Sequence, residues 1–134
     1  MAQSPTRRLR RLHDAVDRLR SREETELARL RAEALRLEQE RAELYAATGG
    51  VGALSLYVDL LARRIGRIDG EIGRVRNAES AAEAALRAQE RRMKLIERMT
   101  VAAVVQERRE DERRALDDWL DAPRQASEKL PGGT

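Results

Sequence analysis

The chain of 134 residues contains no cysteine and no phenylalanine, and its aromatic side chains make up only 2% of the sequence. Without cysteine, disulfide and thiolate chemistry are excluded, and a reducing compartment is allowed without being established. The charged N-terminus is not followed by an apolar run, so we expect no signal peptide. The longest weakly polar run, residues 99–105, is far too short to span a bilayer.

The sequence also lacks the motifs of catalysis and cofactor binding. His13 is the only histidine, and we expect it to flank a helix contact rather than to act as a ligand or a catalyst. The carboxylates alternate with arginines at helical spacing, which is typical of a solvated helix face. The glycine run 49–52 follows a helix and has no lysine after it, so it is not a nucleotide-binding loop. We therefore predict a protein that is not an enzyme, with no catalytic residue, cofactor or metal site.

Charge is abundant but nearly balanced. Charged residues make up 38% of the chain, and the formal net charge is only +3. Almost all the positive charge is arginine, and residues 7–12 form a strongly basic opening. A net charge this small does not by itself indicate nucleic-acid binding. We interpret the basic opening as a solvated face, and binding to anionic lipid or nucleic acid stays open as the alternative.

The second half of the chain carries one long apolar stripe. Its members are spaced alternately by four and three residues, which places them along one line of a helix and predicts a coiled-coil seam. Glu79 and Gln89 are the strongly polar interruptions of this seam. The stripe consists of Leu54, Val58, Leu61, Ile65, Ile68, Ile72, Val75, Ala82, Leu86, Met93 and Ile96.

The first half supplies a matching stripe. One column contains Leu9, Val16, Leu30, Leu37 and Leu44, at multiples of seven, with Glu23 as its break. We place Leu12, Leu19 and Leu27 in a second column. The segment Thr48-Gly49-Gly50-Val51-Gly52 lies between the two halves and predicts a helix stop and a chain reversal.

These patterns predict an all-α fold, an antiparallel two-helix coiled-coil hairpin whose second helix is longer. We expect one domain over 1–134: helix 1 about 5–47, a turn about 48–53, helix 2 about 54–122 and a disordered tail 123–134. Ser4 and Pro5 suit the start of helix 1, and Pro123 suits the end of helix 2. We expect Tyr45, Val51, Leu54, Leu56 and Tyr57 to form a small apolar tip at the turn.

The register follows from folding the chain at Gly50. Leu44 is then expected to meet residues 58–61, Leu37 to meet residues 61–68, and Leu9 to meet residues 89–96. In this register Glu23 falls near residues 75–82 and Glu79 near residues 20–26, which predicts a thinly packed zone there.

Helix 2 outlasts helix 1 in this register, so its end from about Thr100 has no partner within the chain. This end is also acidic, with seven carboxylates against four arginines between residues 107 and 121. An apolar, uncovered and acidic helix end predicts a docking surface for another protein. Its candidate partner-binding residues are Val101, Val105, Leu116, Asp117, Asp118, Trp119 and Leu120.

Three glycines, Gly66, Gly70 and Gly73, lie off the seam on the second helix. Each weakens a helix by up to about 1 kcal/mol relative to alanine. Neutral drift with a slight bend is one interpretation, and a smooth strip approached by the backbone of another chain is the other.

Three features together resemble the FliJ family of bacterial flagellar export proteins, and more broadly the stalk proteins of type III secretion. The first is the pair of long helices with the second one longer. The segment Leu56-Tyr57-Val58-Asp59-Leu60-Leu61 is similar to the family's opening of helix 2, with Leu60 where an aromatic is usual. The segment Glu112-Arg113-Arg114-Ala115-Leu116-Asp117-Asp118-Trp119 resembles the family's charged run near the end of that helix, with Asp118 in place of glutamate.

The resemblance implies a cytoplasmic export chaperone of flagellum biogenesis and motility, held at the inner face of the cell membrane through its partners. Such proteins resemble the central stalk of rotary ATPases and bind both the export ATPase ring and the export-gate membrane protein. By position, Tyr57, Leu60 and Leu61 would lie in the gate-contacting region. Residues 9–12 and 116–120 would enter the ATPase ring. Nucleic acid is not expected as a partner, and a monomer or weak oligomer is expected.

Two other classes of function stay open on the sequence. A generic scaffold or oligomerising coiled coil would pair the projecting helix end with its own copy. A basic-helix module would bind lipid or nucleic acid through the opening of helix 1. Self-association separates the first class from a monomeric stalk, and salt-dependent binding to vesicles or DNA tests the second.

Overall fold

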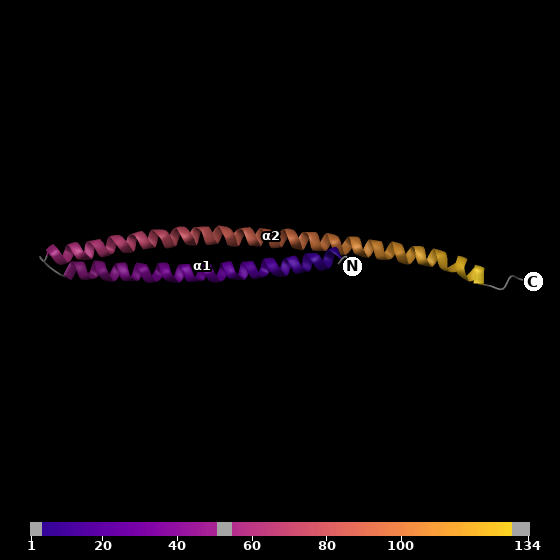
Figure 1. Cartoon of the computed structure of the whole chain (residues 1–134), viewed down its shortest axis with the longest axis horizontal. Coiled ribbons are helices and arrows are strands. Elements are labelled where there is room, and N and C mark those ends of the chain that lie inside the picture. The colour runs from indigo at the N-terminus through magenta and orange to yellow at the C-terminus, as the bar shows by residue number, and fades with distance from the viewer. Residues whose placement is uncertain (1–3, 51–54, 130–134) are drawn as a thin grey trace, which may run out of the picture. The chain divides into compact units, whose positions relative to one another are not determined.

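The computed structural model describes residues 4–50 and 55–129, and its two elements are both helices (Figure 1). Helix α1 covers Pro5–Gly50, and helix α2 covers Ser55–Lys129. The helices pack against each other, which confirms the all-α hairpin with a longer second helix. The chain divides into two units, each described by itself below. The central unit is Ala15–Arg92, and the terminal unit combines Met1–Asp14 with Met93–Thr134.

The start of α1 is where the sequence places it. The backbone amide of Arg7 donates to the Ser4 Oγ at 3.3 Å, and the amide of Arg8 donates to the Ser4 carbonyl at 3.2 Å. A serine side chain that accepts from an amide of the first helical turn is an N-cap, and Pro5 tolerates the first position because its missing N–H would have no partner there.

Both predicted helix ends are corrected. Helix α1 continues through Thr48 and Gly49 to Gly50, and the rest of the predicted turn, with Val51 and Leu54, lies outside the described residues. Helix α2 runs through Pro123 to Lys129, so the predicted end at Ala122 and the predicted disorder of 123–129 are wrong. Proline removes one backbone hydrogen bond to the carbonyl four residues earlier, and water can satisfy that carbonyl where the helix is exposed. Residues 130–134 lie outside the described residues.

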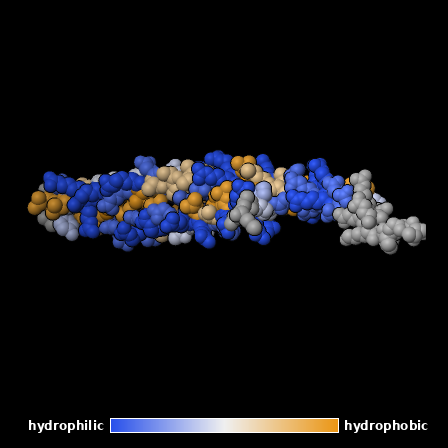
Figure 2. Space-filling model, turned by 45° about the vertical axis from the view of Figure 1, so that its right-hand side comes forward, coloured by the Kyte–Doolittle hydropathy of each residue, from blue (hydrophilic) through white to orange (hydrophobic). Residues whose placement is uncertain are grey.

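The core of the central unit confirms the main stripe on α2. Ile65, Ile68, Ile72 and Val75 are each at most 9% exposed, and Val58, Leu61 and Leu86 are half-buried. From α1 the same core receives Leu37, which is 1% exposed. Hydrophobic residues show between hydrophilic ones on the face seen in Figure 2, as expected when a narrow seam is the main apolar contact. The buried cluster consists of Leu27, Leu30, Ala34, Leu37, Ile68, Ile72, Val75 and Ala82.

Ion pairs across the central unit establish that the helices are antiparallel. Arg41 contacts Asp69 at 3.0 Å, Arg64 contacts Glu40 at 3.3 Å, and Arg76 pairs with Glu38. Farther along, Arg31 lies 3.4 Å from Glu79 and 3.1 Å from Glu83. All these side chains are partly exposed, so each pair adds at most about 1 kcal/mol, and their main value is to show the register.

The register differs from the predicted one by roughly one heptad. Residues 38 and 41 face residues 76 and 69, so Leu37 lies beyond the predicted partners 61–68. Glu79 faces Arg31 instead of residues 20–26, so Glu23 and Glu79 do not share a layer. Both carboxylates are half-buried at seam positions, and the Glu79 carboxylate is paired with an arginine.

Candidate interaction surfaces

One column of the α1 seam contains residues other than those predicted. Leu12 and Leu19 were predicted to lie in the seam, but they are 49% and 40% exposed and do not belong to it. The buried or half-buried column repeats every seven residues and is mostly polar, so a pattern of apolar residues does not identify it. Its members are Thr6, His13, Arg20, Leu27, Ala34, Arg41 and Thr48.

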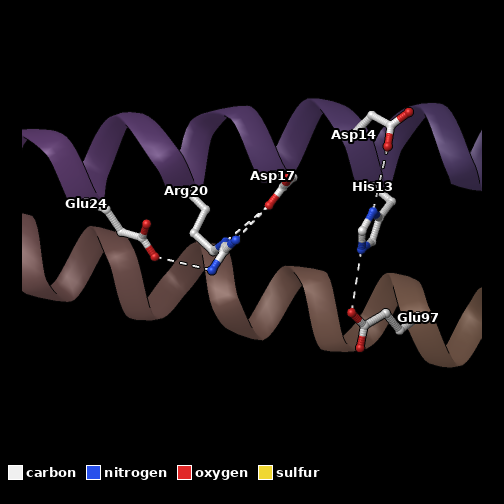
Figure 3. Close-up of polar contacts among 6 residues, drawn as sticks. All are labelled: His13, Asp14, Asp17, Arg20, Glu24 and Glu97. Carbon is white, nitrogen blue, oxygen red and sulfur yellow. Dashed lines mark hydrogen bonds and ion pairs between the residues drawn. The ribbon is translucent and has the colours of Figure 1, made fainter.

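Arginine is accommodated at these positions because its stem can lie along the seam while its guanidinium reaches water. The Arg20 guanidinium donates to the Asp17 Oδ1 at 2.9 Å and to the Glu24 Oε1 at 3.2 Å (Figure 3). The hydrogen bond to Asp17, followed by the charge of Glu24, raises the pKa of Arg20 above its ordinary value. The hydrogen bond to Asp69 raises the pKa of Arg41 in the same way.

In the terminal unit, His13 takes the corresponding position. Its Nδ1 lies 3.9 Å from the Asp14 Oδ1, and its Nε2 lies 3.5 Å from the Glu97 Oε1 on α2 (Figure 3). Sequence reasoning placed His13 beside the seam, whereas it is half-buried in it and bridges toward the second helix. Unbroken spacing by three and four from Thr6 to Leu30 was the signal that could have found it.

Helix α1 covers more of α2 than predicted. The Thr6 amide lies 3.4 Å from the Glu107 Oε1, and Thr100, Ala103 and Glu107 are half-buried. The predicted overhang from Thr100 is therefore wrong by about two turns. Every residue from Arg108 to Ala122 is exposed, and this segment, which we call the projecting segment, continues beyond Thr6 within the terminal unit (Figure 1).

The predicted docking residues of α2 are largely on the surface. Val101, Leu116, Trp119 and Leu120 are between 55% and 68% exposed, and Val105 is 42% exposed. Asp117 and Asp118 are also exposed. Val101 and Val105 are exposed on the part of α2 that α1 covers, beside its half-buried residues. The other five residues lie on the projecting segment.

A groove accompanies Val101 in the terminal unit. It has a volume of about 440 Å³ and opens between the first turns of α1 and the facing turns of α2. Its lining is Arg10, His13, Asp14, Glu97, Thr100 and Val101.

The predicted gate-contacting residues lie in the central unit, near the start of α2. Tyr57 and Leu60 are 52% and 55% exposed, one helical turn apart. Leu61 is half-buried at a seam position, so it is less available to a partner than its neighbours. Tyr45 and Leu56 are exposed as well, whereas the predicted tip residues at 51 and 54 lie outside the described residues.

Nothing among the described residues packs closely against the three outer glycines. A Cβ built on Gly66, Gly70 or Gly73 meets no atom within 4 Å. Alanine therefore fits at each position, and the structure favours neither neutral drift nor a contact with another chain.

Two kinds of feature are absent from the described part of the chain. No group of three or more histidine or acidic side chains among these residues is placed to hold a metal ion. Neither helix, over its described length, has a stretch long and apolar enough to cross a membrane.

No family model matches the chain, and no curated protein or solved structure is significantly similar to it.

Proposed function

We propose that this protein is a non-enzymatic coiled-coil accessory of the flagellar or type III export apparatus, a stalk-like protein that couples the export ATPase to the export gate. The proposal rests on the resemblance in helix lengths and in the segments 56–61 and 112–119. It places the protein in the cytoplasm, at the inner face of the membrane through its partners.

One observation supports a binding role more than any other: α2 extends beyond α1, and the extension carries large exposed apolar side chains. Leu116, Trp119 and Leu120 are all more than half exposed. Isolated apolar side chains on a surface are common, but tryptophan is enriched at the centres of protein interfaces. In the proposal, this segment enters the ATPase ring, and Tyr57 with Leu60 contacts the gate.

Hydrogen exchange with the export ATPase of the same cell tests the proposal. In the free protein, the amides of residues 108–122 should exchange faster than those of residues 65–75, because they belong to an exposed single helix. Adding the ATPase should protect residues 108–122. Exchange that stays unchanged at saturating ATPase would contradict the stalk role and leave the generic scaffold as the better explanation.

Alanine variants locate the contact. Leu116→Ala and Trp119→Ala should each weaken ATPase binding by about 1–3 kcal/mol if these side chains are anchors. Leu35→Ala, at an exposed position of the central unit, is the matched control and should bind normally. Charge reversal at Asp117 and Asp118 should mainly slow association, in a salt-dependent way. If only Tyr57→Ala and Leu60→Ala impair export, the start of α2 is the functional end.

A further inference from the structure

The terminal unit carries a second stripe on α2, away from α1. Residues 101, 105, 108, 112, 116 and 119 are all exposed, whereas the side that meets α1 carries the half-buried residues 100, 103, 104 and 107. Val101 and Trp119 are five turns of about 3.6 residues apart and so have the same direction, with Val105 and Leu116 within about 60° of it. Along the stripe the order is Val, Val, Arg, Glu, Leu, Trp.

The two charges in the middle of this stripe, Arg108 and Glu112, are self-complementary when two copies pair antiparallel. From Glu107 to Arg113 the sequence reads Glu, Arg, Arg, Glu, Asp, Glu, Arg. Consider a second copy laid antiparallel, with Glu110 level with Glu110 of that copy. Arg108 then faces Glu112 of the second copy, and by symmetry Glu112 faces its Arg108. A parallel copy in register would set every charge against itself, which is unfavourable.

The same register also brings the apolar ends of the stripe together. Leu116 falls beside Val105 of the second copy, and Trp119 falls level with its Val101. Apolar side chains thus meet apolar ones on both sides of a charged centre, as a two-fold symmetric contact requires.

The surroundings of Val101 suit the indole of Trp119 from the second copy. The groove beside Val101 is lined by Arg10 and His13 of α1. An arginine against the face of a tryptophan gains a cation–π contact.

From these observations we propose that the protein forms an antiparallel homodimer through the exposed stripe of α2, with the two-fold axis at Glu110 and Trp119 of each copy seated beside Val101 of the other. The contact spans about 27 Å of helix at 1.5 Å per residue. This is short for a stable interface, so we expect a dissociation constant of about 10–100 μM. The dimer does not depend on the proposed export role. It does use the face assigned there to the ATPase, so the two contacts exclude each other.

Charge variants of the full chain test the dimer by sedimentation equilibrium. Arg108→Glu and Glu112→Arg each place like charges in both symmetric pairs, and each should weaken self-association about tenfold or more. The double variant Arg108→Glu/Glu112→Arg restores opposite charges and should associate within about threefold of the parent. An equimolar mixture of the two single variants should form heterodimers. Positions 108 and 112 then carry two carboxylates in one copy and two guanidinium groups in the other, so both facing pairs have opposite charges.

Disulfide trapping tests the register, and the absence of native cysteine makes each introduced thiol unique. Val105→Cys mixed with Leu116→Cys should give a mixed disulfide on oxidation, in excess of either homodimer. Glu110→Cys is the matched control: it lies level with the axis but on the opposite side of the helix, and it should crosslink poorly.

Three results would overturn the proposal. A parent chain that stays monomeric to about 1 mM excludes the dimer. Single charge variants that associate like the parent exclude the charged centre. Glu110→Cys crosslinking as well as the mixed pair excludes the register. The ATPase is absent from all of these experiments, so a negative result would overturn the dimer without bearing on the export proposal.

Discussion

The central unit and the terminal unit use the same seven-residue repeat but fill it with different side chains. In the central unit, Leu30 and Leu37 from α1 pack into a cluster with Ile68 and Ile72 from α2. In the terminal unit, the α1 side offers Thr6, Leu9 and His13, of which Thr6 is buried and the other two are half-buried. The comparison teaches that periodicity brings two helices together, whereas the stability of each stretch depends on what occupies the repeat.

The buried polar group of the terminal unit sharpens this contrast. The Thr6 Oγ1 is buried and finds no hydrogen-bond partner among the described residues. Each buried hydroxyl without a partner costs roughly 1–3 kcal/mol, while each buried leucine contributes roughly 1.5–3 kcal/mol. We therefore expect the central unit to be the last part of the hairpin to open.

The largest expected effect is at the centre of the apolar cluster. Leu37→Ala should lower the free energy of unfolding by about 2–5 kcal/mol, because it removes a fully buried side chain and leaves a cavity. Leu35→Ala is the matched control on the same helix: its side chain is 57% exposed, and the change should stay within about 0.5 kcal/mol. Urea unfolding followed by circular dichroism measures both. Equal effects would mean that this seam is not formed in solution.

A smaller effect of opposite sign is expected in the terminal unit. Thr6→Val keeps the β-branched shape and removes the unpartnered hydroxyl, so it should stabilise the first turns of α1 by about 1 kcal/mol. Hydrogen exchange of the amides of residues 8–14 measures this local stability. Thr25→Val, at an exposed position where the hydroxyl bonds the Ser21 carbonyl at 3.0 Å, should not slow exchange there. Faster exchange in Thr6→Val would show that the hydroxyl does have a partner in solution.

The smallest effect concerns the surface of the central unit. Arg29 donates to Glu26 at 2.6 Å, and this hydrogen bond lowers the pKa of Glu26 below its ordinary value of 4.5. A lowered folded-state pKa contributes stability that is present above pH 4.5 and is lost as the pH falls through the lower value. The stability difference between the parent and Glu26→Gln should therefore vanish in acid, which urea unfolding at a series of pH values measures.

The Arg29→Met background provides the control for that measurement. Without the guanidinium, the effect of Glu26→Gln should depend on pH less than it does in the parent. An equal dependence on pH in both backgrounds would assign the effect to a group other than the pair.

The sequence by itself determined the class of fold and most of the contact face of α2. Residues such as Ile65, Ile68 and Ile72 repeat by three and four, and only a long partner helix can bury such a narrow stripe. The sequence also determined where α1 starts, because the Ser4 cap and Pro5 at the first helical position involve only one turn of the chain. The exposure of Trp119 and Leu116 also followed from the excess length of α2.

Tertiary structure alone decided the register and the second column of α1. A seven-residue repeat looks the same after a shift by seven, so the pattern could not choose between Glu97 and a residue one heptad away, such as Glu90, as the partner of His13. Contacts such as Thr6 to Glu107 make that choice, and they also fix where the projecting segment begins. Polar seam positions such as Arg20 and Arg41 escaped prediction because residue type indicates burial poorly when a long side chain keeps its charge in water.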